Sequence, residues 1–91
     1  MAIELSANAA QGRMIAAGRL LAGWDQGDLA AASGLSGGTI SNVESGRDVR
    51  EETLKAIRKA LREKGIVLTL DKRNGLASAA LIFEEPDVDE E

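Results

Sequence analysis

Apolar positions in the first two thirds of the chain recur at helical spacing, every three or four residues, which predicts a series of helices. The first helix is expected over a run rich in Ala, Leu, Met and Ile that extends to about Ala22. Asn8, with Gln11 three residues later, has the form of a capping box and predicts where this helix begins. Gly23 predicts where it ends.

Two short helices are expected next. Gln26 to Ser33 predicts the second helix, which stops at Gly34 because glycine tolerates the left-handed backbone of a helix end. Ser36 is a favourable N-cap for a third helix, which Gly46 then ends. The spacing therefore predicts two helices joined by a tight turn.

A fourth, amphipathic helix is predicted from the next segment. Asp48 and Glu51 repeat the capping-box spacing, and Gly65 marks the expected end. The apolar stripe of this helix consists of Leu54, Ile57 and Leu61.

The period of the apolar pattern then changes from helical to two, which predicts a β-hairpin. Asn74 and Gly75 form a favourable two-residue turn. Counting outward from that turn gives the expected pairs Leu70–Ala79, Leu68–Leu81 and Ile66–Phe83. One face of such a hairpin is wholly apolar and the other nearly so, which is more apolar surface than one small domain covers easily.

Composition excludes several classes of function. Ninety-one residues with 44% apolar content make one compact domain, and a domain of this size gains from dimerisation. The chain has no cysteine and no histidine, so disulfides, thiolate or imidazole metal sites and the usual nucleophile–base pairs are excluded. We therefore expect no enzyme, metal or cofactor. The sequence lacks a signal-peptide pattern and an apolar run of about 20 residues, so we expect a cytoplasmic protein with no membrane partner.

The charge is unevenly distributed. The net charge is −4, but residues 84–91 hold six acids and no base, which leaves 11 bases and 9 acids, a net of +2, in residues 1–83. A weakly cationic body is compatible with binding nucleic acid. We expect three parts: a helical domain (1–65), a hairpin that serves as a dimerisation element (66–83) and a disordered acidic tail (84–91).

Ten residues at fixed offsets carry a family resemblance. They are Gln26, Leu29, Ala30, Ser33, Gly34, Ser36, Ile40, Ser41, Glu44 and Gly46. The pattern, over roughly residues 13–65, resembles the Cro and phage-repressor type of helix-turn-helix, the xenobiotic-response-element (XRE) family. The resemblance implies a mainly α fold, a four-helix lambda-repressor-like domain, here followed by the β-hairpin and the disordered acidic tail.

The resemblance also implies roles for individual residues. It places an ion pair between Arg19 and Glu44 on the first and third helices. Phosphate contacts are expected from Gln26, Ser36, Thr39, Ser45, Arg47 and Arg50. Base contacts in the major groove are expected from Gly37, Gly38, Ser41 and Asn42.

Two of the four expected base-reading positions are glycines, so only Ser41 and Asn42 have side chains that can hydrogen bond. Asn42 is the better candidate, because its amide can bind adenine in two places. Gly37 and Gly38 have two interpretations: they let the helix N-terminus approach the DNA closely, or no side chain was required there.

The function implied by these features is a sequence-specific regulator of transcription that binds double-stranded DNA, a repressor that reads a pseudo-palindromic operator as a homodimer. The hairpin is expected to supply the dimer interface, through Ile66, Leu68, Leu70, Leu81 and Phe83. The alternative is an antitoxin that binds a protein toxin and represses its own operon. The acidic tail and the sparse base-reading helix favour this alternative.

Overall fold

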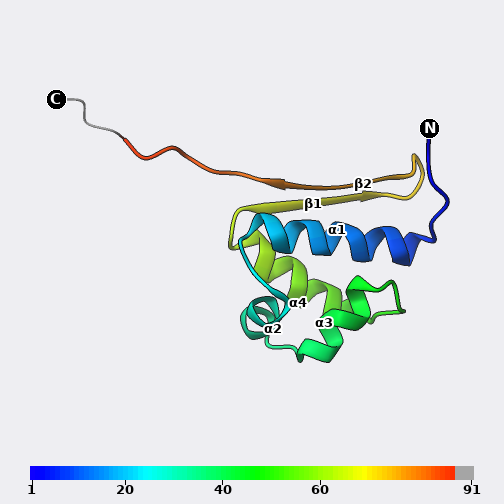
Figure 1. Ribbon diagram of the computed structural model, residues 1–91, viewed down its shortest axis with the longest axis horizontal. Coiled ribbons are helices and arrows are strands. Elements are labelled where there is room, and N and C mark those ends of the chain that lie inside the picture. The colour runs from blue at the N-terminus through cyan, green and yellow to red at the C-terminus, as the bar shows by residue number, and fades with distance from the viewer. Residues whose placement is uncertain (88–91) are drawn as a thin grey trace.

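The computed structural model describes residues 1–87 and contains the four helices and the hairpin that the sequence predicts. The elements are α1 (Ala7–Leu21), α2 (Gln26–Ser33), α3 (Gly37–Glu44), α4 (Glu51–Arg62), β1 (Ile66–Asp71) and β2 (Leu76–Leu81). The hairpin lies along one side of α1, and the other three helices lie on the opposite side (Figure 1). In the part of the chain described, no helix is long and apolar enough to span a bilayer.

The predicted acidic tail lies partly outside the described residues. Residues 84–87 are exposed and have no regular secondary structure, whereas residues 88–91 are not described.

The N-cap of α1 lies two residues earlier than predicted. Ser6 is the N-cap, and its Oγ accepts a hydrogen bond from the N–H of Ala9 at 3.0 Å. The predicted capping box at Asn8 is therefore wrong. Asn8 lies inside the helix, where its Nδ2 donates to Asp48 Oδ1 at 2.7 Å.

The same contact changes the start of α4. Asp48 was expected to cap this helix, but its carboxylate accepts from Asn8 instead. The N-cap of α4 is Arg50, which makes no side-chain capping hydrogen bond. The side chains of Glu51 and Glu52 place negative charge in the first turn, which the helix dipole favours.

The caps of α2 and α3 fix the turn between them. Asp25 and Asp28 form a reciprocal capping box at the start of α2. Gly34 ends α2 with φ of +75°, a left-handed conformation that suits glycine. Ser36 then caps α3, as predicted, by accepting from the N–H of Thr39 at 3.1 Å.

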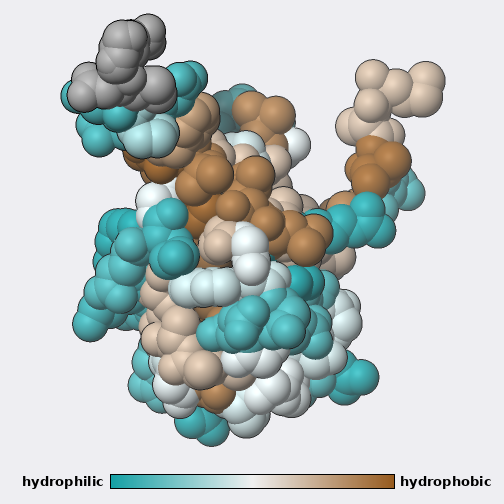
Figure 2. Space-filling model, turned by 60° about the vertical axis from the view of Figure 1, so that its left-hand side comes forward, coloured by the Kyte–Doolittle hydropathy of each residue, from teal (hydrophilic) through white to brown (hydrophobic). Residues whose placement is uncertain are grey.

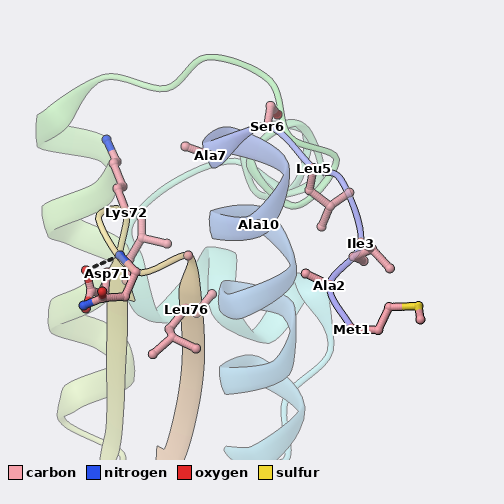
Figure 3. A pocket seen from close by; sticks show the side chains of 14 residues that line it. Met1, Ala2, Ile3, Leu5, Ser6, Ala7, Ala10, Asp71, Lys72 and Leu76 are labelled. Carbon is pink, nitrogen blue, oxygen red and sulfur yellow. Dashed lines mark hydrogen bonds between the residues drawn. The ribbon is translucent and has the colours of Figure 1, made fainter.

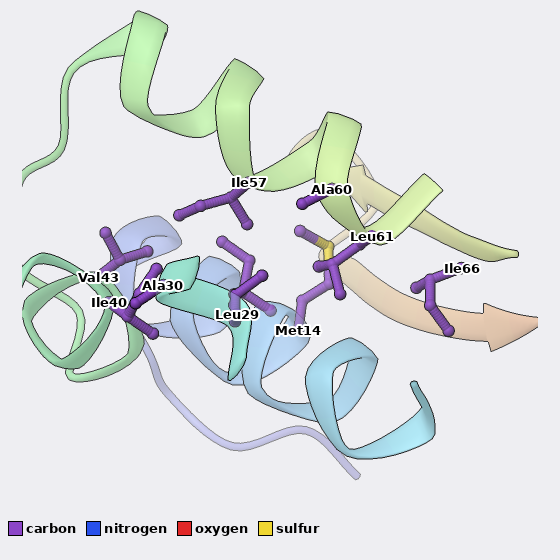
Figure 4. Packing of buried hydrophobic residues seen from close by; sticks show 10 residues of the cluster. Met14, Leu29, Ala30, Ile40, Val43, Ile57, Ala60, Leu61 and Ile66 are labelled. Carbon is purple, nitrogen blue, oxygen red and sulfur yellow. The ribbon is translucent and has the colours of Figure 1, made fainter. Parts of the chain in front are cut away.

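The core lies between the helices and extends to the first residue of the hairpin (Figure 4). Its buried side chains are Met14, Ile15, Leu29, Ala30, Ile40, Val43, Ile57, Ala60, Leu61 and Ile66. Close packing against α1 requires glycine at Gly12, where a Cβ atom would lie 2.5 Å from the carbonyl oxygen of Val43 and 2.7 Å from that of Glu44. Because both atoms are backbone, α3 can approach α1 this closely only at a residue with no side chain.

The hairpin pairs in a register that differs from the predicted one by two residues. Ile66 pairs with Leu81, Leu68 with Ala79 and Leu70 with Ala77. The prediction assumed a two-residue turn, but the turn contains four residues, 72–75, between the paired residues Asp71 and Leu76. A shift of two leaves every side chain on its predicted face, because side chains alternate along a strand.

Asp71 stabilises the longer turn. Its carboxylate accepts from Asn74 Nδ2 at 2.8 Å and from the backbone N–H groups of Asn74 and Arg73, each at 3.1 Å. These hydrogen bonds, that from the Asn74 side chain most of all, hold the pKa of Asp71 below its ordinary value.

The expected dimer-interface residues separate into two groups. Ile66 is only 2% exposed, and Leu68 and Leu70 pack against the same core, so these three side chains are used mainly within their own chain. Ile66 therefore presents almost no side-chain surface to a second copy, and the expected interface through these residues stays a prediction. Leu81 and Phe83 remain 39% and 72% exposed.

Candidate nucleic-acid interface

Helix α3 presents a polar, exposed face at the end of the molecule farthest from the hairpin (Figure 1). Ile40 and Val43 point into the core and hold the helix in place. The four positions expected to face DNA bases are all exposed, namely Gly37, Gly38, Ser41 and Asn42. The turn of the helix that would enter a groove therefore offers one hydroxyl and one amide to a ligand.

The two glycines of this face are not required by packing. A Cβ atom at Gly37 would meet no atom within 4 Å, and one at Gly38 would meet only Ser36 Oγ at 3.9 Å. Both residues have ordinary helical backbone, with no positive φ. The free protein thus has room for side chains at both positions, in contrast to Gly12.

The expected ion pair between α1 and α3 is present and well formed. Arg19 donates from Nε to Glu44 Oε2 at 2.8 Å and from Nη2 to Glu44 Oε1 at 3.1 Å, with side chains 14% and 7% exposed. The third guanidinium nitrogen, Nη1, donates to the carbonyl oxygen of Trp24 at 3.0 Å. These hydrogen bonds with Glu44 raise the pKa of Arg19. The pair fixes the C-terminal end of α3 against α1.

Gln26 joins this network, which the sequence did not predict. Its Nε2 donates to Glu44 Oε1 at 2.9 Å, so the side chain connects the start of α2 to the end of α3. Gln26 remains half-buried. An amide has a second N–H and a carbonyl oxygen, so a hydrogen bond to Glu44 still leaves donor capacity for a phosphate.

The expected phosphate-binding hydroxyls lie at the two ends of α3. Ser36 Oγ and Thr39 Oγ1 are 2.9 Å apart at its N-terminus, and both belong to the capping arrangement. Ser45 at the other end donates from Oγ to the carbonyl oxygen of Asn42 at 3.0 Å. Ser36 and Ser45 are exposed, and Thr39 is half-buried.

Arg47 and Arg50 follow α3 in the exposed loop before α4. The nearest carboxylate to Arg50 is that of Glu52, 3.8 Å away, and both side chains are largely exposed, at 84% and 78%. Such an exposed pair contributes little stability, so Arg50 can exchange this partner for another anion. A shallow hollow between α3 and α4 lies beside this loop and is lined by Thr39, Asn42, Val43, Asp48, Val49, Arg50 and Thr53.

The hydrogen bond between Asn8 and Asp48 also supports the site, because it attaches the loop after α3 to the start of α1. Local sequence gave no signal for it, since both residues have a plausible interpretation as helix caps.

A comparison with family models agrees with the resemblance to the Cro and phage-repressor type of helix-turn-helix. A model described as helix-turn-helix matches residues 15–66, which is 52 of the 91 residues. The chain belongs to this family, of the Cro/C1 type, and is a DNA-binding regulator of transcription. Comparisons with curated proteins and with solved structures give no match.

Proposed function

We propose that the protein is a dimeric repressor that reads a pseudo-palindromic operator by inserting α3 of each subunit into the major groove. The observation that carries this proposal is the exposure of Ser41 and Asn42 on a helix whose other side is buried. A bidentate contact from the Asn42 amide to adenine discriminates by about 1 to 3 kcal/mol against a wrong base.

The remaining contacts position the protein without reading sequence. Gln26, Ser36, Thr39 and Ser45 border α3, and Arg47 and Arg50 lie in the loop beyond it. Hydroxyls, amides and guanidinium groups in such positions bind phosphate oxygens. With glycine at two base-reading positions, we expect specificity to depend on Asn42, on Ser41 and on the shape of the DNA.

Selection of bound sequences from a random pool of duplex DNA, at defined salt, tests these roles. The unaltered chain should enrich a symmetric motif, and Asn42→Ala should lose the preference at one position of each half-site while it keeps salt-dependent affinity. Glu63→Ala, at the exposed end of α4, serves as a control away from α3 and should retain the motif. An unchanged motif with Asn42→Ala would remove Asn42 from base readout.

An antitoxin that binds a protein toxin is the second candidate. Two observations favour it: α3 has few groups that read bases, and the segment after β2 combines exposed Ile82 and Phe83 with the acids Glu84 and Glu85. A gene for a small toxic protein beside this one, whose product forms a stable complex with this chain, would distinguish it from a stand-alone repressor.

A further inference from the structure

Strand β2 has one free edge. The N–H of Ile82 donates to the carbonyl oxygen of Gly65 at 2.8 Å, which continues the ladder between β2 and β1. Alternate residues of an antiparallel strand direct their backbone groups to opposite edges. Since Ile82 faces β1, the N–H and C=O groups of Ala77, Ala79 and Leu81 face away from β1.

This edge lacks the features that usually prevent strands from pairing. Leu76 to Phe83 contains no charged residue and no proline. Proteins normally protect an exposed edge with one of these or with a covering element. Of the hairpin residues whose backbone groups point outward, Ala77 and Leu81 are exposed and Ala79 is half-buried, so α1 leaves this edge largely uncovered.

Large apolar side chains are exposed at both ends of the same strand. Leu76 is 62% exposed at its start, and Ile82 and Phe83 are 68% and 72% exposed just beyond its end. In Figure 2 an apolar band crosses the molecule above the more polar helical body. The middle of the strand has only small side chains, so a second strand can approach there.

A groove with both polar and apolar lining residues lies beside the start of β2, between the hairpin turn and the segment that precedes α1 (Figure 3). Ile3, Leu5 and Leu76 are among its lining side chains, and they are 70%, 40% and 62% exposed. Gly75 also lines it and leaves space for a neighbouring side chain, because a Cβ atom there would meet nothing within 4 Å.

We propose that two copies of this chain pair through their β2 edges to form a continuous four-stranded antiparallel sheet, with Ala79 opposite Ala79 of the partner subunit. This inference rests on the dimer of the proposed function and specifies how it forms. In this register, Ala77 lies opposite the partner's Leu81. The outward backbone groups of Ala77, Ala79 and Leu81 can therefore all form hydrogen bonds across the interface. A shift of two in either direction loses part of this ladder.

The same register brings the two exposed ends together. Leu76 lies directly opposite the partner's Ile82 on the outer face of the sheet. On the face that covers α1, the partner's Phe83 lies over Gly75, beside this groove. Each apolar end of β2 then packs beside the opposite end of the second copy.

Charges beyond the strand are complementary in this arrangement. Lys72 and Arg73 lie in the hairpin turn and make no salt bridge within residues 1–87. In the proposed register, Arg73 lies opposite the partner's Glu85, and the adjacent Glu84 adds to the negative charge. The acids after β2 therefore meet the basic turn of the second copy.

The area available is close to what a stable dimer needs. The exposed apolar side chains involved are Ile3, Leu5, Leu76, Leu81, Ile82 and Phe83. At on the order of 100 Å² each, with the strand edge in addition, they approach the roughly 800 Å² per partner of a standard interface.

The symmetry also suits a DNA-binding dimer. The two-fold axis that relates two identical antiparallel strands is perpendicular to their sheet, so both copies of α1 lie on one face of it. Because α3 lies on the far side of α1 from the hairpin (Figure 1), both copies of α3 lie on the same side of the dimer.

Cysteine cross-linking of the full chain tests the register, because the natural sequence has no cysteine. Ser78 and Ala80 are both exposed. In the proposed register, Ser78 lies opposite Ala80 of the partner subunit, in a pair that is not hydrogen-bonded. Cα atoms of such a pair are about 4.5 Å apart, within the range of a disulfide. An equimolar mixture of Ser78→Cys and Ala80→Cys proteins should form a covalent heterodimer on mild oxidation, whereas neither variant alone should cross-link.

Sedimentation of the unaltered chain distinguishes a failure of the proposed register or edge pairing from a failure of the proposed dimer. A dimer in which Ser78→Cys alone, or Ala80→Cys alone, cross-links would overturn the register. A dimer in which no combination cross-links would overturn edge pairing but leave the proposed dimer standing. A monomer at micromolar concentration would overturn both.

Discussion

At the scale of single residues, Glu44 connects α3 to both α1 and α2. Its two carboxylate oxygens accept from Arg19 and Gln26, and its side chain is 7% exposed. Removing one partner of a buried ion pair leaves the other charge without compensation, which typically costs about 3 to 5 kcal/mol. We predict that Glu44→Ala lowers the free energy of unfolding by an amount near this range, measured by urea denaturation.

Glu52→Ala is the matched control. Glu52 also lies near an arginine, but both partners are largely exposed and 3.8 Å apart, so its loss should change stability by less than about 1 kcal/mol. A loss of less than about 1 kcal/mol for Glu44→Ala as well would show that the buried network adds little to the stability of the domain.

Two glycines of the same helical domain should respond in opposite ways to alanine. At Gly38 the space is open and the backbone helical, so Gly38→Ala should raise stability by up to about 1 kcal/mol, because alanine is the better helix former. At Gly12 a Cβ atom would lie 2.5 Å from a backbone oxygen, so Gly12→Ala should destabilise, by about 1 to 3 kcal/mol. Thermal unfolding of the two variants measures both signs.

The DNA affinity of Gly38→Ala distinguishes the two interpretations of the glycines in α3. A large loss of affinity in a more stable protein would indicate that the backbone approaches DNA closely there. An unchanged affinity would indicate that no side chain was required.

At the scale of elements, local signals predicted the existence of each helix and strand found in residues 1–87, and failed where distant residues compete for a cap. The Ser36 cap and the Gly34 stop involve only neighbouring residues, and both were confirmed. Asn8 and Asp48 each have the spacing of a capping residue, yet they are 40 positions apart in sequence and hydrogen bond to each other. No pattern within either helix encodes that choice.

The hairpin register shows a related limit. Alternation along the strands gave the faces correctly, because the faces depend only on the period. The turn length depends on what the Asp71 side chain does. Its carboxylate accepts three hydrogen bonds from turn residues, and these favour the longer turn. The Asn-Gly pair is compatible with either length, so sequence alone did not decide between them.

The site was predictable in outline because burial determines it. Ile40 and Val43 are three residues apart and must face the core, which turns Ser41 and Asn42 outward. The hydrogen bond of Gln26 to Glu44 was not predictable, since it requires the crossing geometry of α2 and α3.

At the scale of the whole molecule, α1 separates the hairpin from the helix that we propose binds DNA. The hairpin covers one side of α1, and α3 projects from the other side (Figure 1). A partner bound along β2 therefore leaves α3 free. In the proposed function, dimer formation and DNA binding are then compatible in one complex.

This separation leads to a prediction about operator geometry. If a rigid sheet holds the two copies of α3 on one side of the dimer, they reach two major-groove sites on the same face of the duplex, about one helical turn apart. Inserting about five base pairs between the half-sites of a selected operator rotates one site to the opposite face. Affinity measured by titration should then fall toward that of non-specific DNA, which is typically weaker by a factor of 10³ or more. As a control, the central base pairs are substituted without a change of spacing. This measures how much the altered sequence alone lowers affinity. Full affinity for the lengthened operator would mean that the two helical domains bind independently, and the rigid sheet between them would have to be abandoned.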